Sequence, residues 1–272
     1  LLAEALPVRF SAALAKGRNN YLCFRRLALA VQQRQKVFSR PGHLEQIEAL
    51  AEWAMQTETG SLQDIEFPLD AEVWAKARSE PGLCRGAQCA HRGRCHFLAA
   101  RRRVQAAEIV VTNHALFFAD LALPGEAAEL LGEYERAVFD EAHTVERVAS
   151  DHFGRSVSSA AVEALLRELY SERTDRGLLA LADDREAISA VGRAGAAAEA
   201  FFAALAEAGP PGVTGSGRIT APGVVPNSLT PALMDVAAKL RALRRRLGAN
   251  ESAFELLGLE QRAERAAEQL DA

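Results

Sequence analysis

Cysteine is scarce in this sequence, with four among 272 residues. Disulfide-stapled scaffolds belong to small secreted proteins, and no secretory signal is visible here. No hydrophobic run is long enough and free enough of charge to predict a membrane span. The glycine-rich phosphate loop GxxxxGK(S/T) is also missing, so the chain by itself lacks the usual backbone cradle for nucleotide phosphates.

The charge is unevenly distributed along the chain. A formal net charge of -4 and a pI near 5.9 would by themselves argue against a polyanionic partner. Residues 16–106, however, hold fifteen Lys or Arg against nine Asp or Glu, so the acidic excess lies elsewhere. With 49% hydrophobic and 25% charged residues, the composition is that of a soluble protein with one large or two modest domains.

Three of the four cysteines lie in residues 83–107, a stretch without any acidic residue. Cys84, Cys89 and Cys95 stand five and six residues apart, and Cys23 lies 61 residues upstream of the first. Three thiolates in one loop and a fourth brought in by the fold can enclose an iron-sulfur cluster. Zinc is less favoured, because structural zinc sites usually use CxxC pairs. Buried structural thiols or two disulfides are the remaining alternatives.

Short helices are predicted around these cysteines. Residues 21–37 lack Gly and Pro and are rich in helix formers, which predicts a helix with Cys23 near its start. A second helix is predicted to open at residues 39–41, where a proline lies near the first turn. Asp70 is predicted to cap a short helix, and residues 96–106 to form another.

Residues 108–140 have the sequence pattern of an α/β fold. Residues 108–113 and 136–140 are short apolar runs that predict buried strands, and a helical stretch, HALFFADLAL, lies between them. Residues 8–14 are a weaker candidate for a further strand. The order strand, helix, strand predicts a parallel sheet with its site at the carboxyl ends of the strands.

Beyond Ser150 the chain is alanine-rich and predicted to be helical. Residues 209–226 predict a loop, because nine of these eighteen residues are Gly or Pro. On either side of a break at residues 248–250, apolar residues recur in steps of three and four, which predicts a helical hairpin. The recurring residues are Leu229, Leu233, Val236, Leu240, Leu243 and Leu247, then Leu256, Leu259, Ala263, Ala266 and Leu270.

The sequence VFDEAH follows the second apolar run and contains Asp140, Glu141 and His143. An aspartate at a strand tip can hold magnesium through water, and a neighbouring glutamate can orient or deprotonate the water that attacks a phosphate. The alternative is that Glu141 and His143 form the first turn of an ordinary helix, where an acidic residue is favourable.

Taken together, KGRNNYLC, the Cys84, Cys89 and Cys95 loop with ARRRVQAAEIVVTNHALFFADL after it, and VFDEAH resemble the iron-sulfur superfamily 2 DNA helicases of the DinG and XPD type. The bacterial DinG-like branch is the better match. In that family a RecA-like motor domain is interrupted by a four-cysteine cluster domain and by a helical arch domain. The resemblance therefore implies an α/β fold with mostly helical insertions and a partial RecA-like parallel sheet. It places residues 1–20 and 107–150 in motor domain 1, residues 21–106 in the iron-sulfur domain and residues 151–272 in a truncated arch.

The resemblance also implies roles for single residues. Cys23, Cys84, Cys89 and Cys95 match the ligands of one four-iron four-sulfur cluster. Asp140 matches the magnesium-binding acid, Glu141 the catalytic glutamate, and His143 the residue that couples nucleotide state to the motor. ATP and magnesium are the implied cofactors of the complete protein.

The function implied is that of an ATP-dependent DNA helicase in DNA repair or replication, acting on single-stranded or forked DNA. A bacterial cytoplasmic location near the nucleoid is expected, without a membrane partner; protein partners are left open. Because the phosphate loop and a second motor domain are missing, the chain is interpreted as an internal fragment that is inactive alone. The alternatives are a metal-stabilised nucleic-acid-binding module and a helical interaction protein.

A run of cations accompanies the cysteines. Six arginines without an intervening acid are the electrostatic footprint of phosphate binding, so they are predicted to contact the DNA backbone. The alternative is a solvated helix face. The arginines are Arg85, Arg92, Arg94, Arg101, Arg102 and Arg103.

Overall fold

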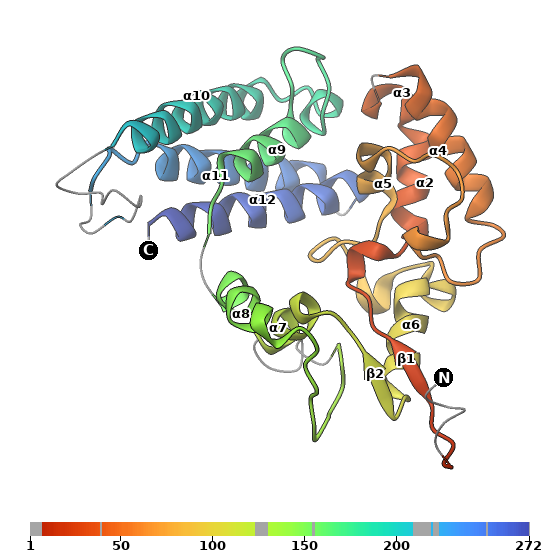
Figure 1. The fold of residues 1–272 in the computed structure, drawn as a ribbon. Helices are drawn as coiled ribbons and strands as arrows, with labels where there is room; N and C mark the ends of the chain where they lie inside the picture. Colours follow the sequence, from red (N-terminus) through yellow and green to blue (C-terminus); the bar gives the residue numbers. More distant parts are fainter. Residues whose placement is uncertain are drawn as a thin grey trace. The chain divides into compact units, whose positions relative to one another are not determined.

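The computed structural model describes residues 7–38, 40–122, 130–153, 156–208, 219, 223–248 and 250–271 (Figure 1). The chain divides into two compact units. The N-terminal unit comprises Leu1–Arg34 and Arg40–Arg155, and the C-terminal unit comprises Gln35–Ser39 and Ser156–Ala272. Short 3-10 helices lie at Arg18–Asn20 (η1), Leu62–Asp64 (η2), Gly86–Gln88 (η3), Arg92–Arg94 (η4), Ala142–Thr144 (η6) and Leu179–Leu181 (η7).

The predicted helices around the cysteines are confirmed with small shifts of their ends. They are α2 (Phe24–Gln32), α3 (Arg34–Val37), α4 (Pro41–Trp53), α5 (Ala71–Ala77) and α6 (His96–Gln105). The helix expected over residues 21–37 begins only at Phe24 and is interrupted at Gln33. Asp70 is the N-cap of α5, where its side chain accepts a hydrogen bond of 2.8 Å from the Glu72 amide.

The core of the N-terminal unit forms where α2 packs against α4 and α5. Leu22, Ile47, Leu50 and Val73 are almost completely buried there. Arg26 is also buried, with 3% of its side chain exposed, and it donates to the Arg78 carbonyl at 2.8 Å and to the Glu80 carboxylate at 3.0 Å. This buried cation is acceptable because its charge is paired and hydrogen-bonded.

A small parallel sheet lies in the same unit. Strand β1 (Ala12–Leu14) pairs with β2 (Ile109–Val111), with Ala12 opposite Ile109 and Leu14 opposite Val111. The helix predicted after residues 108–113, α7 (His114–Leu121), is confirmed, and the sheet is parallel as expected. Its second strand comes from the candidate at residues 8–14, not from residues 136–140. The predicted burial of the whole strand is wrong, because Val111 is 55% exposed. Only the central residue of each strand packs on the small cluster of Ala15, Val104 and Leu131.

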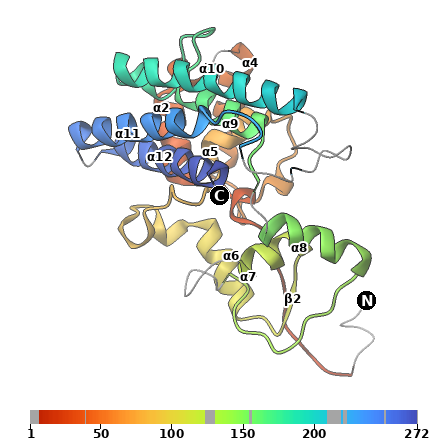
Figure 2. The same cartoon turned by 90° about the vertical axis from the view of Figure 1, so that its left-hand side faces the viewer.

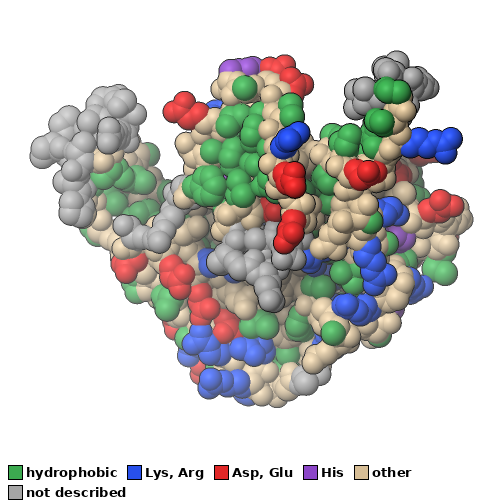
Figure 3. Space-filling view, turned by 90° about the horizontal axis from the view of Figure 1, so that it is seen from below, with side chains coloured by type: hydrophobic (Ala, Val, Ile, Leu, Met, Phe, Trp, Pro, Cys, Tyr) green, Lys and Arg blue, Asp and Glu red, His purple; other side chains and the backbone are tan. Residues whose placement is uncertain are grey.

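The strand predicted at residues 136–140 is also wrong. These residues form no strand, and the Val138 side chain is 97% exposed. A strand is stable only when its N–H and C=O groups find ladder partners. In the described part of the chain, the sheet contains β1 and β2 alone, so this apolar run has no neighbour to pair with. Hydrophobic side chains consequently reach the surface, as Figure 3 shows for one face. Helix α8 (Val145–Phe153) follows and packs against α7.

The regular elements of the C-terminal unit are helices in its described residues, and an isolated bridge joins Ser171 and Arg176 in a turn. Its main helices are α9 (Ser159–Leu169), α10 (Arg185–Glu207), α11 (Leu229–Leu247) and α12 (Glu251–Leu270). Helices α11 and α12 pack along each other, and α11 also packs against α10 (Figure 2). The predicted hairpin is confirmed, since the leucine seam of α11 lies in the core. Most of the loop expected at residues 209–226 lies outside the described residues.

Helix α10 is long and apolar enough to cross a membrane by length and composition alone. That pattern went unnoticed in the sequence. A core helix passes the same test, and one face of α10 packs in the hydrophobic cluster of this unit through Ala187, Val191 and Ala194. Because 22% of its apolar window is buried, this packing accounts for the apolar residues of that one face.

Candidate functional site

The four cysteines lie at the ends of short elements in the N-terminal unit. Cys23 directly precedes α2, Cys89 ends η3, and Cys95 links η4 to α6, while Cys84 lies in the loop before η3. All four are free thiols, so the two disulfides considered as an alternative are not formed. Free thiols at the ends of helices and turns suit a soft metal centre, because sulfur donors select iron-sulfur clusters, zinc or copper.

Aromatic contacts connect the residue after Cys23 with the distant cysteine loop. The Phe24 ring lies 6.2 Å from the His91 ring and 5.1 Å from the His96 ring, measured between centroids. The Arg94 guanidinium sits 4.1 Å above the same phenyl ring. Because His96 follows Cys95 directly, these contacts bring the start of α2 to the start of α6.

A second contact connects the start of α2 with Cys84. The buried Arg25 guanidinium donates a hydrogen bond of 2.8 Å to the carbonyl of Leu83, the residue before Cys84. Its positive charge acts on the thiols of both Cys23 and Cys84. One cation therefore influences two cysteines that are 61 residues apart in sequence.

The pKa values of the Cys23 and Cys84 thiols are shifted in opposite directions. Burial raises the pKa of the Cys23 thiol, and the charges of Arg25 and Arg26 offset this only partly. Burial also raises the pKa of Cys84, but the Gly86 amide, 3.4 Å from its sulfur, and the Arg18 guanidinium outweigh burial and leave it below its ordinary value. Guanidinium groups near the Cys23 and Cys84 thiols favour thiolates there, which is the form that an iron-sulfur cluster needs.

Gly60 contributes to this arrangement in a way that the sequence did not reveal. Its φ angle is +62°, and a Cβ atom built on it would lie 2.2 Å from the His96 ring. Only glycine allows the backbone to approach the imidazole so closely. The roles of Phe24, His91 and His96 were missed as well; the available signal was that Phe24 and His96 each follow a cysteine directly.

The acidic segment has a definite geometry although it carries no strand. Asp140 accepts a hydrogen bond of 2.9 Å from the Glu141 amide, and Glu141 adopts a left-handed backbone conformation with a φ angle of +48°. The His143 Nδ1 atom lies 3.3 Å from the Glu141 carboxylate. Both carboxylates are exposed, so a hydrated divalent cation can reach them.

Helix α7 positions this segment. The His114 Nδ1 atom lies 3.0 Å from the Thr144 hydroxyl, which donates to the Glu141 carbonyl at 3.0 Å. The Phe139 ring packs on His114 and Phe117, with centroids 5.7 and 5.0 Å apart. Since α7 begins three residues after β2, the acidic pair lies near the carboxyl end of that strand.

The six predicted DNA-contacting arginines are not equivalent in the structure. Arg92, Arg94, Arg102 and Arg103 are exposed, whereas Arg85 and Arg101 are half-buried. Arg94 is engaged with Phe24 and His91. The exposed members without such contacts are the better probes of phosphate binding.

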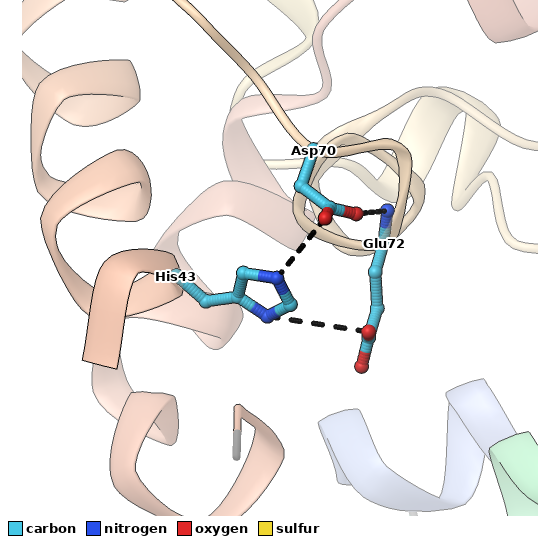
Figure 4. A group of neighbouring side chains, drawn as sticks. All are labelled: His43, Asp70 and Glu72. Carbon is cyan, nitrogen blue, oxygen red and sulfur yellow. Dashed lines mark hydrogen bonds and ion pairs between the residues drawn. The ribbon is translucent and has the colours of Figure 1, made fainter. Parts of the chain in front are cut away.

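A separate cluster of His43, Asp70 and Glu72 has the residue types of a metal site (Figure 4). The two carboxylates, however, face opposite nitrogens of the buried imidazole: Nε2 lies 3.3 Å from Asp70, and Nδ1 lies 4.0 Å from Glu72. A metal ion binds one ring nitrogen, so these carboxylates do not converge on one ion position with it. Arg40 also pairs with Asp70 at 3.2 Å. The cluster instead connects the first turns of α4 and α5.

This cluster predicts a pH effect on stability. The Glu72 amide holds the pKa of Asp70 below its ordinary value of 3.8, assisted by His43 and Arg40. A carboxylate with a lowered pKa stabilises the fold above the unfolded value and loses that effect as pH falls through the folded pKa. Asp70→Asn keeps a good N-cap. It should therefore be less stable than the wild type near neutral pH, with a difference that shrinks in acid.

Urea unfolding from pH ~6 down to ~3 measures this difference. The control is Glu66→Gln, which removes an exposed carboxylate; its difference from the wild type should stay small across that range. A gap between Asp70→Asn and wild type that stays constant over the same range would contradict the role given to the charge.

No protein-family model matches the chain. It is 33% identical over 170 residues to "ATP-dependent DNA helicase YoaA" of Haemophilus influenzae, a match that covers 62% of this chain and 26% of that protein. It is 32% identical over 162 residues to "ATP-dependent helicase DinG" of Mycobacterium tuberculosis, covering 55% of this chain and 24% of the relative. The chain thus spans about a quarter of the length of these relatives. These similarities support the assignment of the chain as a DinG-like helicase segment.

Proposed function

We propose that the chain is the part of an ATP-dependent DNA helicase that holds an iron-sulfur cluster and the magnesium and water side of the ATP site. The observation that carries the proposal is the placement of Asp140 and Glu141 near the carboxyl end of β2, in a chain similar to named helicases. Parallel α/β sheets bind ligands at that end of their strands. A bacterial cytoplasmic location and a role in DNA repair or replication are part of the same proposal.

Each part of the chain has a proposed task. Residues 1–20 and 107–150 belong to the motor domain, residues 21–106 form the cluster domain, and residues 151–272 form the helical arch. Cys23, Cys84, Cys89 and Cys95 would hold the cluster, which would cross-link their four segments. The contacts of Phe24 and Arg25 with the cysteine loop support this ligand set.

Asp140 and Glu141 have different proposed roles at the ATP site. Asp140 would hold magnesium through water, and Glu141 would orient or deprotonate the attacking water. His143 contacts the Glu141 carboxylate, and we propose that it passes changes at the nucleotide to the rest of the motor. The test is single-stranded-DNA-stimulated ATP hydrolysis by the complete protein that contains this chain. Glu141→Gln should abolish it, and a fully active variant would refute the assignment.

DNA binding by the basic cluster region is tested with Arg92→Glu combined with Arg102→Glu. Both side chains are exposed, so reversal should not disturb packing. If each contacts a phosphate, the variant should bind a single-stranded oligonucleotide at least about tenfold more weakly, with a shallower salt dependence. Fluorescence anisotropy over a salt series measures both quantities.

The control reverses Arg147 and Arg167, which are also exposed but lie on α8 and α9, each near an acidic residue one turn away. It changes the net charge by the same amount away from the cysteines. Equal weakening by both variants would show that only overall charge matters, and the cluster region would lose its proposed role in DNA contact.

A further inference from the structure

A cavity of about 550 Å³ opens in the N-terminal unit beside β1. It is lined by the strand residues, by the turn that contains Thr59, Ser61 and Asp64, and by Ala100 and Arg103 of α6. Lys16 and Tyr21 complete the polar part of its wall. The volume falls within the range of small-ligand sites, about 300–1,000 Å³. The cavity is separate from both the cysteine loop and the acidic segment.

Two cations, Lys16 and Arg103, line this cavity. The Lys16 ammonium donates one hydrogen bond, of 2.9 Å, to the hydroxyl of the buried Ser61. In the described part of the chain neither Lys16 nor Arg103 forms an ion pair. An ammonium group has three N–H donors, so Lys16 keeps two for a ligand. Basic side chains that line a cavity and have no ion-pair partner favour an anionic ligand.

The acidic residue of the cavity wall, Asp64, is engaged in a hydrogen bond of its own. Asp64 accepts a short hydrogen bond from the Thr59 hydroxyl, next to the turn that carries Ser61. Arg103 and Asp64 act in opposite directions on the buried Tyr21 phenol, whose pKa burial raises. Arg103, Asp64 and Tyr21 all line the cavity. With Lys16 included, the polar wall has two positive charges and one negative.

We propose that this cavity binds a phosphate group, through the Lys16 ammonium, the Arg103 guanidinium and the Ser61 hydroxyl. The donor set matches that ligand, because a guanidinium fork, an ammonium and a hydroxyl present several N–H and O–H groups to a tetrahedral oxyanion. Within the proposed function, the source of the phosphate is the backbone of single-stranded DNA. Only this last step rests on the proposed function; anion binding itself does not.

The experiment uses the 272-residue chain, with its thiols reduced or its cluster reconstituted. Inorganic phosphate and a labelled oligothymidine are titrated separately into the wild type, Lys16→Met and Asp64→Asn. Lys16→Met should weaken both ligands roughly tenfold and reduce the salt slope for the oligonucleotide by about one. Asp64→Asn should strengthen both, which loss of folding cannot imitate. Arg167→Met on α9 serves as the charge-matched control and should change neither titration.

The outcomes separate the inference from the proposed function. Weakening for phosphate alone upholds the anion site and overturns DNA as the source of the phosphate. If Lys16→Met and Asp64→Asn both bind phosphate and the oligonucleotide as the wild type does, the cavity is not an anion site. The proposed function still stands in that case if the Arg92→Glu, Arg102→Glu variant binds the oligonucleotide more weakly. An oligonucleotide that does not bind the wild type at all overturns the DNA-contacting role, whereas phosphate binding that responds to Lys16 still upholds the cavity.

Discussion

Cys84→Ser is expected to abolish assembly of the iron-sulfur cluster and to remove the brown colour of the purified protein. The same result is expected for Cys23→Ser, Cys89→Ser and Cys95→Ser, because a four-iron cluster of this kind takes four thiolates. The chain has four cysteines, so no spare thiol can replace a lost ligand. Visible absorbance together with iron and sulfide analysis measures the loss.

The substitutions should also loosen the polypeptide around the cluster. The four proposed ligands come from the starts of α2 and α6 and from the loop between α5 and α6. Because metal binding and folding are coupled, loss of the centre should increase hydrogen exchange and proteolysis over residues 21–106. Helices α11 and α12 lie in the other compact unit and should keep their protection.

The control is Met234→Ser, which removes a sulfur-containing side chain at an exposed position of α11. It should leave both the colour and the protease pattern unchanged. If Cys23→Ser keeps the full iron content, Cys23 is not a ligand. If metal analysis of the wild type finds stoichiometric zinc and no sulfide, the site binds zinc and the iron-sulfur prediction is wrong.

The second large effect concerns ATP. The 272-residue chain is expected not to hydrolyse ATP, although it contains Asp140 and Glu141. Phosphoryl transfer depends on positioning and on charge neutralisation, and the acidic pair supplies only the magnesium and water side of this arrangement. No phosphate loop with its lysine occurs in the sequence. Loss of an arginine finger alone costs about a thousandfold or more in rate in related phosphoryl-transfer enzymes.

A nucleotide titration and a phosphate-release assay on the purified chain measure this expectation, with Glu141→Gln as the control. Wild type and variant should give the same background rate, because the site lacks the groups that hold the γ-phosphate in line. Turnover that disappears in Glu141→Gln would show that the site is complete in these 272 residues. The interpretation of the chain as part of a larger motor would then fail.

The helices could be predicted because the rules that form them act over one or two turns. The proline at the start of α4, the capping side chain of Asp70 and the leucine seam of α11 all depend on neighbours within about seven residues. The strand at residues 136–140 failed for the opposite reason. A strand depends on a partner from elsewhere in the chain, and no described strand lies beside it.

For the candidate site, too, some features could be predicted from the sequence and others could not. The sequence by itself determined which groups are available: four cysteines, an acid-free basic stretch, and an Asp-Glu pair after an apolar run. The number and softness of the cysteine ligands predict a soft metal centre, and their spacing favours an iron-sulfur cluster over zinc; both stay predictions. These conclusions needed no knowledge of long-range contacts.

Only the tertiary structure decided which groups meet. It placed Phe24 against His91 and His96, brought the Gly60 backbone onto His96, and joined Lys16 to Ser61 across 45 residues. It also showed that the acidic pair is positioned by α7 rather than by a strand of its own. Such contacts depend on the closure of long loops and on backbone approach distances, and neither leaves a periodic signal in the sequence.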